Sequence, residues 1–461
     1  MTATAVATAS ARAPGRVHDL GHGWLVELLS ANSATAYLRS HGSPRELDAF
    51  RAQVPICNYE TLSPWLQRVA GGESDVLFRG RPCAYERTGG SAGGSKLIPY
   101  SVAGLADFRR AVSPWLATTL DRHGITGTVY FSISPVARAA EQLGGVPVGL
   151  PDSAYLDDAM CDVLMTRSAV PLSVSALADV GEWRTKTRHY LAAAHEIELI
   201  SVWSPTFLLS LLDEHQAIEA GWRRLKVISC WADGSSAPYA DELAERFPGV
   251  AIEPKGLIST EAVVTVPNAK GEPELIGGGF FEFLRHEQTF LAHELEPGGE
   301  YEVVATTASG LYRYRTGDVV RCRTYAGSGR PILVFVGRSG LNSDLVGEKL
   351  SESFVAAGLA FLPGFSLLVP DASKRAYVLV RDRHTTAGEI ARLEANLCRN
   401  PQYAYARTLG QLAPLTAMYV RRAFAMLEAC LLERGVWLGA IKPTALRPEP
   451  FWIDVFAQGC Q

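Results

Sequence analysis

A glycine-rich stretch with several hydroxyl groups and one lysine is the part of the sequence best suited to chemistry. It spans residues 85–100 and places four glycines and three hydroxyl residues directly before Lys96. Glycines lack a Cβ, so successive backbone N–H groups can converge on one concavity and bind an anion. The hydroxyl groups add donors, and the lysine adds a compact positive charge that suits a phosphate. The stretch therefore predicts a loop that holds the phosphates of a nucleotide.

Three other structures have to be compared with this interpretation. A Walker A loop is excluded, because Ser95 rather than glycine precedes the lysine and Leu97 follows it. Residues 89–93 match the Gly-x-Ser-x-Gly nucleophile elbow of α/β-hydrolases, with Ser91 as the nucleophile. An elbow leads straight into a helix, which Pro99 disfavours. A flexible surface loop is the third alternative.

Composition and charge limit the classes of protein to consider. The chain has 461 residues, of which 47% are hydrophobic, so it is long enough for two or three domains with a large core. A net charge of −4 argues against a nucleic-acid or membrane partner. The eight cysteines are scattered without a Cys-x-x-Cys pair, which argues against zinc sites and a disulfide framework. We expect a cytoplasmic protein.

The elements that would position the loop begin with helices on either side of it. Residues 19–68 have helical spacing of apolar side chains, and Pro64 is predicted in the first turn of a helix. After the loop, Ser101 is predicted to cap a helix over residues 102–122, which a strand at 128–134 follows.

Helices and strands alternate from residue 181 to residue 261, which predicts a mainly parallel sheet. A helix is expected to begin at Ser204 and Pro205, a cap followed by a proline in the first turn. Ligands gather beyond the carboxyl ends of such strands. Here those ends carry residues 231–234 and 256–261. The predicted strands are 199–203, 226–231 and 250–253.

Residues 277–336 read instead as an antiparallel β segment. A short strand at 311–314 would place Tyr312 and Tyr314 on one face and Arg313 on the other, by the period of two. A turn at 316–318 would then leave the carboxylate of Asp318 exposed.

The fold class expected is α/β, in three parts. Residues 1–18 are predicted to be a disordered tail, residues 19–338 a large N-terminal domain, and residues 339–461 a small α/β C-terminal domain. A linker is expected at 339–343. Within the C-terminal domain the predicted helices are 348–357 and 386–397, and the predicted strands are 364–369 and 376–380.

A series of short motifs runs in order along the chain. The stretches are 54–60, 88–99, 259–261, 281–283, 301–304, 310–318, 335–338, 347–349 and 400–403. In this order they resemble the adenylate-forming superfamily of acyl-CoA synthetases, adenylation domains and luciferases. More closely, the chain resembles the Gretchen Hagen acyl-acid amido synthetases of plants and bacteria. The resemblance covers about residues 50–445, and 310–318 is its most specific part.

The resemblance implies a large adenylate-forming domain with parallel sheets and a β segment, followed by a small mobile domain with a hinge near Arg338. It also implies ATP and Mg²⁺. A carboxylic acid would attack the α-phosphorus and release pyrophosphate, and an amine such as an amino acid would then accept the acyl group. The thiol of CoA or of a carrier protein is the alternative acceptor, and a serine hydrolase using Ser91 is the alternative of another class. The family context further suggests bacterial secondary metabolism.

The same resemblance carries residue roles. The residues expected at the phosphates are Thr88, Gly89, Ser91, Gly93 and Lys96. Those expected at adenine and ribose are Gly256, Leu257, Ser259, Thr260, Asp318 and Arg338. Glu261 would bind Mg²⁺ through oxygen. Lys349 and Lys442 are two candidates for the C-terminal catalytic lysine. Leu257 departs from the family, which usually has an aromatic residue there.

Overall fold

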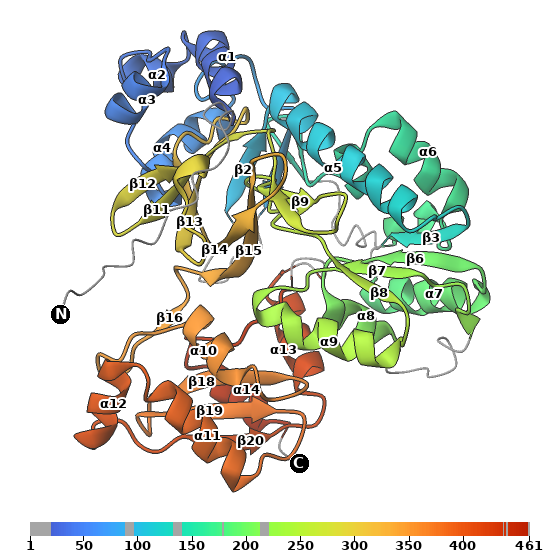
Figure 1. Cartoon of the computed structure of the whole chain (residues 1–461), viewed down its shortest axis with the longest axis vertical. Coiled ribbons are helices and arrows are strands. Elements are labelled where there is room, and N and C mark those ends of the chain that lie inside the picture. Colours follow the sequence, from blue (N-terminus) through green and yellow to red (C-terminus); the bar gives the residue numbers. More distant parts are fainter. Residues whose placement is uncertain are drawn as a thin grey trace, which may run out of the picture.

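The computed structural model of the chain describes residues 20–87, 96–131, 141–177, 179–212, 221–436, 438 and 441–459. These residues form a mixed α/β fold with several sheets (Figure 1). No helix in these ranges combines the length and hydrophobicity that crossing a bilayer requires. The short 3₁₀ segments are η2 (Asp152–Tyr155), η3 (Leu172–Ala176), η5 (Gly234–Ser236) and η6 (Ala292–Glu294).

The N-terminal residues are helical, as predicted. The helices are α1 (His22–Asn32), α2 (Ala36–Ser40), α3 (Leu47–Gln53) and α4 (Tyr59–Ala70). The predicted start of a helix at Pro64 is wrong, because this proline lies inside α4. The helix begins about a turn earlier because Asn58 and Thr61 form a capping box. Asn58 Oδ1 accepts from the Thr61 N–H at 2.9 Å, and Thr61 Oγ1 accepts from the Asn58 N–H at 3.0 Å.

The glycine-rich stretch lies between two paired strands. Strands β1 (Ala84–Arg87) and β2 (Leu97–Tyr100) are antiparallel, and they belong to a sheet of order β2-β1-β5-β4 with β4 (Glu141–Leu143) and β5 (Val146–Val148). Helix α5 (Val102–Arg122) follows directly. Its predicted cap is confirmed, since Ser101 Oγ accepts from the Gly104 N–H at 2.9 Å.

The predicted parallel sheet is confirmed. Its order is β3-β6-β7-β8, and every neighbouring pair is parallel. The strands are β3 (Thr128–Phe131), β6 (Ile197–Ser201), β7 (Val227–Cys230) and β8 (Ala251–Pro254). The helices of this part are α6 (Asp158–Arg167), α7 (Val180–Ala193), α8 (Pro205–Leu212) and α9 (Ala237–Arg246). Helix α8 begins at the predicted Ser204-Pro205 signal.

The predicted antiparallel segment forms a seven-stranded sheet of order β12-β11-β13-β14-β15-β10-β9. Its first strands are β9 (Thr265–Pro267), β10 (Pro273–Leu275), β11 (Phe280–Arg285) and β12 (Gln288–Leu291). The remaining ones are β13 (Glu300–Thr306), β14 (Tyr314–Tyr325) and β15 (Pro331–Arg338). The β14–β15 pair forms one wall of the site described below.

Two details of β14 differ from the prediction. The strand begins only at Tyr314, because Arg313 has a φ of 48° and its buried guanidinium pairs with Glu282 at 2.8 Å. The expected turn at 316–318 is wrong, because Gly317 and Asp318 lie within the strand. Gly317 takes a positive φ of 79° and the register with β15 shifts just beyond it, so the chain continues without reversing. Asp318 is therefore buried, with 2% of its surface exposed, rather than exposed at a turn.

The C-terminal residues contain the predicted small α/β arrangement. A two-stranded sheet pairs β16 (Asn342–Ser343) with β17 (Leu350–Ser351), so part of the expected linker is a strand. A second sheet has the order β18-β19-β20, formed by β18 (Ser366–Asp371), β19 (Ala376–Arg381) and β20 (Thr416–Tyr419). The helices are α10 (Glu352–Leu359), α11 (Ala387–Leu397), α12 (Pro401–Thr408), α13 (Ala423–Glu433) and α14 (Trp452–Ala457).

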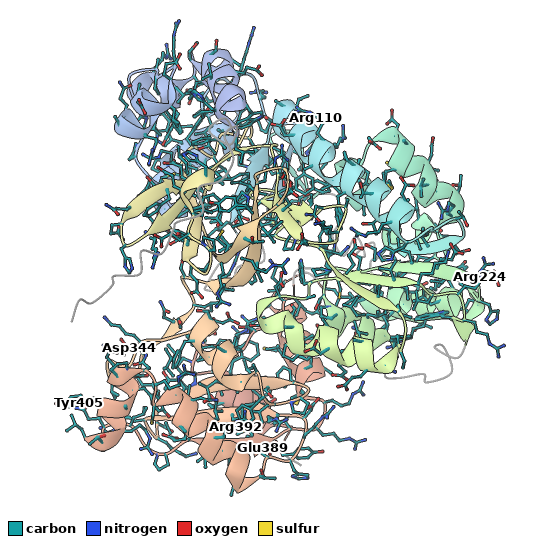
Figure 2. The ribbon with its side chains drawn as sticks, in the orientation of Figure 1. Arg110, Arg224, Asp344, Glu389, Arg392 and Tyr405 are labelled. Carbon is teal, nitrogen blue, oxygen red and sulfur yellow. The ribbon has the colours of Figure 1, made fainter. Side chains whose placement is uncertain are left out.

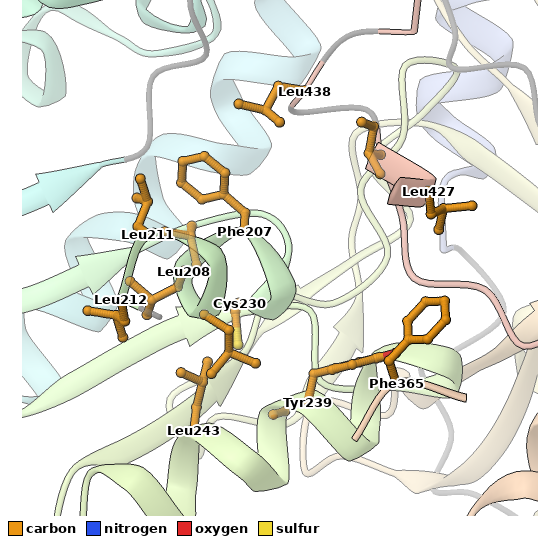
Figure 3. Close-up of a cluster of buried hydrophobic side chains, with 14 of the residues drawn as sticks. Phe207, Leu208, Leu211, Leu212, Cys230, Tyr239, Leu243, Phe365, Leu427 and Leu438 are labelled. Atoms are coloured by element: carbon orange, nitrogen blue, oxygen red, sulfur yellow. The ribbon is translucent and has the colours of Figure 1, made fainter. Parts of the chain in front are cut away.

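One apolar cluster joins the helices around the parallel sheet to the C-terminal residues (Figure 3). Phe207 and Tyr239 belong to the first group, and Phe365 and Leu427 to the second. An ion pair of 2.6 Å between Arg184 on α7 and Glu428 on α13 crosses the same boundary. The C-terminal part is thus held against the parallel sheet by buried apolar surface as well as by the chain connection.

Candidate functional site

An open cavity lies where the carboxyl ends of β7 and β8 meet the β14–β15 pair and the C-terminal residues. Its volume is about 1050 Å³, including its open mouth. The residues on its wall come from three regions: the parallel sheet, the β14–β15 pair and the C-terminal residues. They include Trp231, Asp233, Gly256 and Leu257 from the parallel sheet, Asp318, Phe335 and Arg338 from β14 and β15, and Glu352, Lys442 and Arg447 from the C-terminal part.

A buried carboxylate and an arginine form the base of the cavity. Asp318 and Arg338 lie opposite each other on β14 and β15, and Arg338 Nε donates to Asp318 Oδ1 at 2.9 Å. The Asp318 carboxylate raises the pKa of Arg338, and Glu261 adds to that effect. The pair is a charge-assisted hydrogen bond on two hydrogen-bonded strands, so the carboxylate is held in one orientation at the cavity wall.

Lys442 reaches this pair from the C-terminal part. Its side chain is accessible from the cavity although protein surrounds it, and its Nζ lies 4.8 Å from the centre of the Trp231 ring. Burial and the nearby Arg338 lower the pKa of Lys442, while Asp318 and Glu261 act in the opposite direction. The other candidate, Lys349, is exposed and does not line the cavity. The structure thus brings only one of these two lysines to the site.

Glu261 lies close to the same charged groups. Its side chain is only 8% exposed, and its carboxylate acts on the pKa values of both Arg338 and Lys442. The described residues contain no group of three or more His, Cys, Asp or Glu side chains able to hold a metal ion. A single carboxylate is nevertheless what Mg²⁺ needs when substrate phosphates supply other oxygens, so Glu261 fits that use.

Lys96 approaches the site from the end of the glycine-rich stretch. Its Nζ lies 3.5 Å from the Tyr314 hydroxyl and 5.5 Å from the centre of the Tyr59 ring. Burial raises the pKa of Tyr314, and Glu261 raises it further, so Tyr314 lies near both Lys96 and Glu261. The other residues expected at the phosphates lie outside the described residues; they are Thr88, Gly89, Ser91 and Gly93.

The residues expected at adenine and ribose divide into two groups. Gly256 and Leu257 line the cavity. Gly256 has a φ of 77°, and a Cβ there would come within 2.5 Å of the Thr265 carbonyl oxygen. Ser259 and Thr260 do not line it. Instead Ser259 Oγ donates to the Ala262 carbonyl at 3.2 Å, and the Thr260 carbonyl accepts from the Tyr100 hydroxyl at 2.6 Å, so both shape the backbone that carries Glu261.

Three charged residues of the cavity wall received no role from the sequence: Asp233, Glu352 and Arg447. Asp233 follows β7. Burial raises its pKa to about 6, although the hydrogen bond that its carboxylate accepts from the Phe335 N–H acts to lower the pKa. Its segment was noted as a strand end, which was the signal available. Glu352 accepts from Ser235 Oγ and from the Ala445 N–H at 3.1 Å. Neither Glu352 nor Arg447 lies in a motif, and only the packing of distant segments places them here.

Solved structures with the same arrangement define the class of fold. The chain matches 2-hydroxyisobutyryl-CoA ligase in its postadenylation state with a TM-score of 0.55 at 13% identity, over 89% of this chain and 92% of that one. It matches the GH3.15 acyl acid amido synthetase with a TM-score of 0.81 at 19% identity, over 96% and 94%. The fold is therefore that of the adenylate-forming enzymes.

The sequence comparisons are more specific. The GH3 family N-terminal domain matches residues 12–217, and the GH3 family central domain matches residues 274–338. The probable indole-3-acetic acid-amido synthetase GH3.1 of Oryza sativa subsp. japonica is 24% identical over 73% of this chain and 68% of its own length. The jasmonoyl-L-amino acid synthetase JAR6 of Nicotiana attenuata is 23% identical over 71% and 70%. The chain belongs to the GH3 family.

Proposed function

We propose that the protein is an ATP-dependent amide synthetase. It adenylates a carboxylic acid, releases pyrophosphate and transfers the acyl group to an amine such as an amino acid. The observation that carries this proposal is the placement of Lys442 beside Asp318 and Arg338 in one cavity, with the Glu261 carboxylate near enough to act on the pKa of Lys442. The relatives reported above support it, because one is named an indole-3-acetic acid-amido synthetase and the other a jasmonoyl-L-amino acid synthetase.

The base of the cavity has the chemistry to hold the nucleoside. An ionised carboxylate can accept hydrogen bonds from both hydroxyls of a ribose, and we assign Asp318 to that role with Arg338 orienting it. Gly256 and Leu257 would pack against the adenine ring, and this contact would be aliphatic rather than aromatic stacking. Ser259 and Thr260 would act indirectly, by holding the backbone that leads to Glu261.

The phosphates call for positive charge, and Lys96 lies beside Tyr314 at the end of the glycine-rich stretch. We assign Lys96 to the phosphates, together with Thr88, Gly89, Ser91 and Gly93 of the preceding stretch. Glu261 would hold Mg²⁺, which when bound neutralises charge on the phosphate oxygens. Such a site acts mainly by positioning its substrates and compensating their charge.

We assign Lys442, which lines the cavity, to the first half-reaction. A carboxylate oxygen of the acid attacks the α-phosphorus, and the bond to the bridging oxygen of pyrophosphate breaks. The ammonium group would stabilise negative charge as that exchange occurs. In the second half-reaction the amine attacks the acyl carbon, loses a proton, and AMP leaves. We propose that the C-terminal part moves about a hinge near Arg338 between the two steps.

Acid-dependent ATP–pyrophosphate exchange tests the first half-reaction directly. The panel should contain indole-3-acetic acid and jasmonic acid, suggested by the relatives, together with aliphatic and benzoic acids. We expect exchange with at least one acid. No exchange with any member of a broad panel would contradict the proposal.

The acceptor is tested separately. Reactions with the active acid and ATP receive either an amino-acid mixture or CoA, and mass spectrometry identifies the product. We expect an amide that forms without CoA. Acyl-CoA without any amide would reject the amide synthetase and leave adenylation standing. Labelling of Ser91 by a fluorophosphonate would favour the hydrolase instead.

Two broader expectations stay predictions. We propose a cytoplasmic location, which fractionation of the source cells would test. A role in bacterial secondary metabolism is likewise proposed, although the relatives reported above are plant proteins. Loss of a small conjugated metabolite on deletion of the gene would support it.

A further inference from the structure

The wall of the cavity contains a buried guanidinium to which the proposed function gives no role. Arg447 lines the cavity, and only 7% of its surface is exposed. Its backbone is held firmly, because the Arg447 N–H donates to the Leu368 carbonyl at 3.0 Å and Leu446 bridges to Leu368 of β18. The guanidinium stacks over Trp452, with its central carbon 5.6 Å from the ring centre. Its position is therefore fixed by the fold.

The hydrogen-bonding capacity of this guanidinium is not used up. Within the described residues its Nε is buried and has no hydrogen-bond partner. Burial lowers the pKa of Arg447, and the carboxylates of Glu449 and Glu352 offset this only in part. Both carboxylates already have donors, Trp452 Nε1 at 3.1 Å for Glu449 and the Ala445 N–H and Ser235 Oγ for Glu352. A buried cation that lines a cavity and keeps an unpaired donor calls for an anionic ligand.

The charges around the cavity show which anion that is. Lys442 and Arg338 interact with each other and with Asp318 and Glu261, so they form the reacting end. Arg447 interacts instead with Glu352 and Glu449, so it belongs to a separate charged group. If the proposed function is correct, the nucleotide and the carboxylate being activated occupy the reacting end and the stretch before it that ends in Lys96. One anion of the complete reaction is then unassigned, the carboxylate that an amino acid carries besides its amine.

We propose that Arg447 binds the carboxylate of the acceptor amino acid. A guanidinium forms two parallel hydrogen bonds with a carboxylate, which fixes orientation as well as position. The contact would turn the amine toward the acyl group and would exclude simple amines that lack the carboxylate. This inference rests on the proposed amide synthetase function and names a subsite for its second substrate.

The test separates the two half-reactions. The variants are Arg447→Met, Arg447→Lys and the control Arg392→Met. The Arg392 guanidinium also lies over an aromatic ring, 4.1 Å from the centre of the Phe361 ring, but Arg392 is on α11 (Figure 2) and does not line the cavity. Each variant is assayed by ATP–pyrophosphate exchange with the acid most active in the panel, and by amide formation with each of the twenty amino acids and its carboxamide.

Arg447→Met should keep exchange within about two-fold of wild type, because the acceptor takes no part in that step. Its KM for the amino acid should rise about ten- to a hundred-fold, the scale of lost charged hydrogen bonds. The KM of Arg447→Met for the carboxamide should not change. For the amino acid, the KM of Arg447→Lys should lie between those of wild type and Arg447→Met. Arg392→Met should match wild type in every assay.

Other outcomes would overturn the inference. A parallel loss of exchange would place Arg447 at the nucleotide or the acid, and an unchanged KM would remove any role in acceptor binding. An equal rise of KM for amino acid and carboxamide would reject carboxylate recognition. If Arg447→Met does not fold, wild-type kinetics in Arg447→Lys would decide against the inference. Absence of exchange in the wild type would instead reject the proposed function itself, and this inference with it.

Discussion

The two walls of the cavity are built by different means. On the N-terminal side Asp318 and Arg338 lie on neighbouring strands, and their pairing is part of the register of β14 and β15. On the C-terminal side Lys442 and Arg447 lie on a segment without regular structure that is held by single contacts, such as the bridge from Leu446 to β18. The first wall is set by a continuous hydrogen-bond ladder. The second depends on how distant segments pack.

The largest effect on activity should come from removing the ammonium group of Lys442, which the C-terminal wall places beside Asp318 and Arg338. Lys442→Ala should slow acid-dependent ATP–pyrophosphate exchange by about 10²- to 10³-fold, the scale of one preorganised charged donor. Lys349→Ala is the matched control and should stay within about two-fold of wild type, because Lys349 is exposed outside the cavity. If Lys349→Ala slowed the reaction and Lys442→Ala did not, the assignment of Lys442 as the catalytic lysine would be wrong.

Removing the carboxylate of the first wall should have the next largest effect. Asp318→Ala should weaken ATP binding by about 1.5–3 kcal/mol, as expected for hydrogen bonds to a charged group. Equilibrium binding of ATP measures this, and 2′-deoxy-ATP provides the control. Wild-type protein should bind the deoxynucleotide less tightly than ATP, whereas the variant should distinguish the two much less. Equal binding of both nucleotides by the wild type would exclude the ribose assignment.

Asp233 offers a pH test of the first wall. Its folded pKa of about 6 is raised above the value of about 3.9 for an unfolded aspartate, so the folded state binds the proton more tightly. That stabilising contribution is complete below about pH 4 and is lost as the pH rises through about 6. An asparagine does not titrate, so the Asp233→Asn variant does not lose stability in this way as the pH rises. Between pH 4 and 7 its free energy of unfolding should rise relative to wild type by about 1–2 kcal/mol. Urea unfolding across that range measures the difference, and a constant difference would show that Asp233 does not titrate in this way.

The smallest effect should come from a single contact between the two walls. Ser235→Ala removes the hydroxyl that donates to Glu352, while Glu352 keeps the Ala445 N–H. We expect a loss of about 1 kcal/mol in the free energy of unfolding. Ser33→Ala, which removes an exposed hydroxyl bonded within its own helix end, should change it by less than about 0.5 kcal/mol. Guanidinium chloride unfolding compares them. Equal effects would mean that the Ser235–Glu352 contact contributes nothing specific.

The same contrast explains what the sequence could predict. The cap at Ser101 and the start of α8 at Ser204 and Pro205 were confirmed, because such signals act through neighbouring residues. The parallel sheet was also predicted, from the alternation of helices and strands. In contrast, Asp318 was expected at an exposed turn, because the sequence does not reveal that β15 covers it.

The site was predictable only in part for the same reason. Asp318 and Arg338 were named from motifs and Gly256 from the end of a predicted strand, and the structure places all three on the cavity wall. The choice between Lys349 and Lys442 could not be made, because it depends on packing across more than a hundred residues of chain. Arg447 lies in no motif, and its burial beside Trp452 arises from tertiary contacts alone.

The apolar cluster that spans the parallel sheet and the C-terminal part has a calorimetric consequence. Phe207 and Tyr239 on one side and Phe365 and Leu427 on the other remove one another from water. If either side unfolded alone, it would leave the other with exposed apolar surface, and hydration of that surface would raise the heat capacity at once. Heating should therefore melt both parts in a single cooperative transition, even though the chain is long enough for two independent ones.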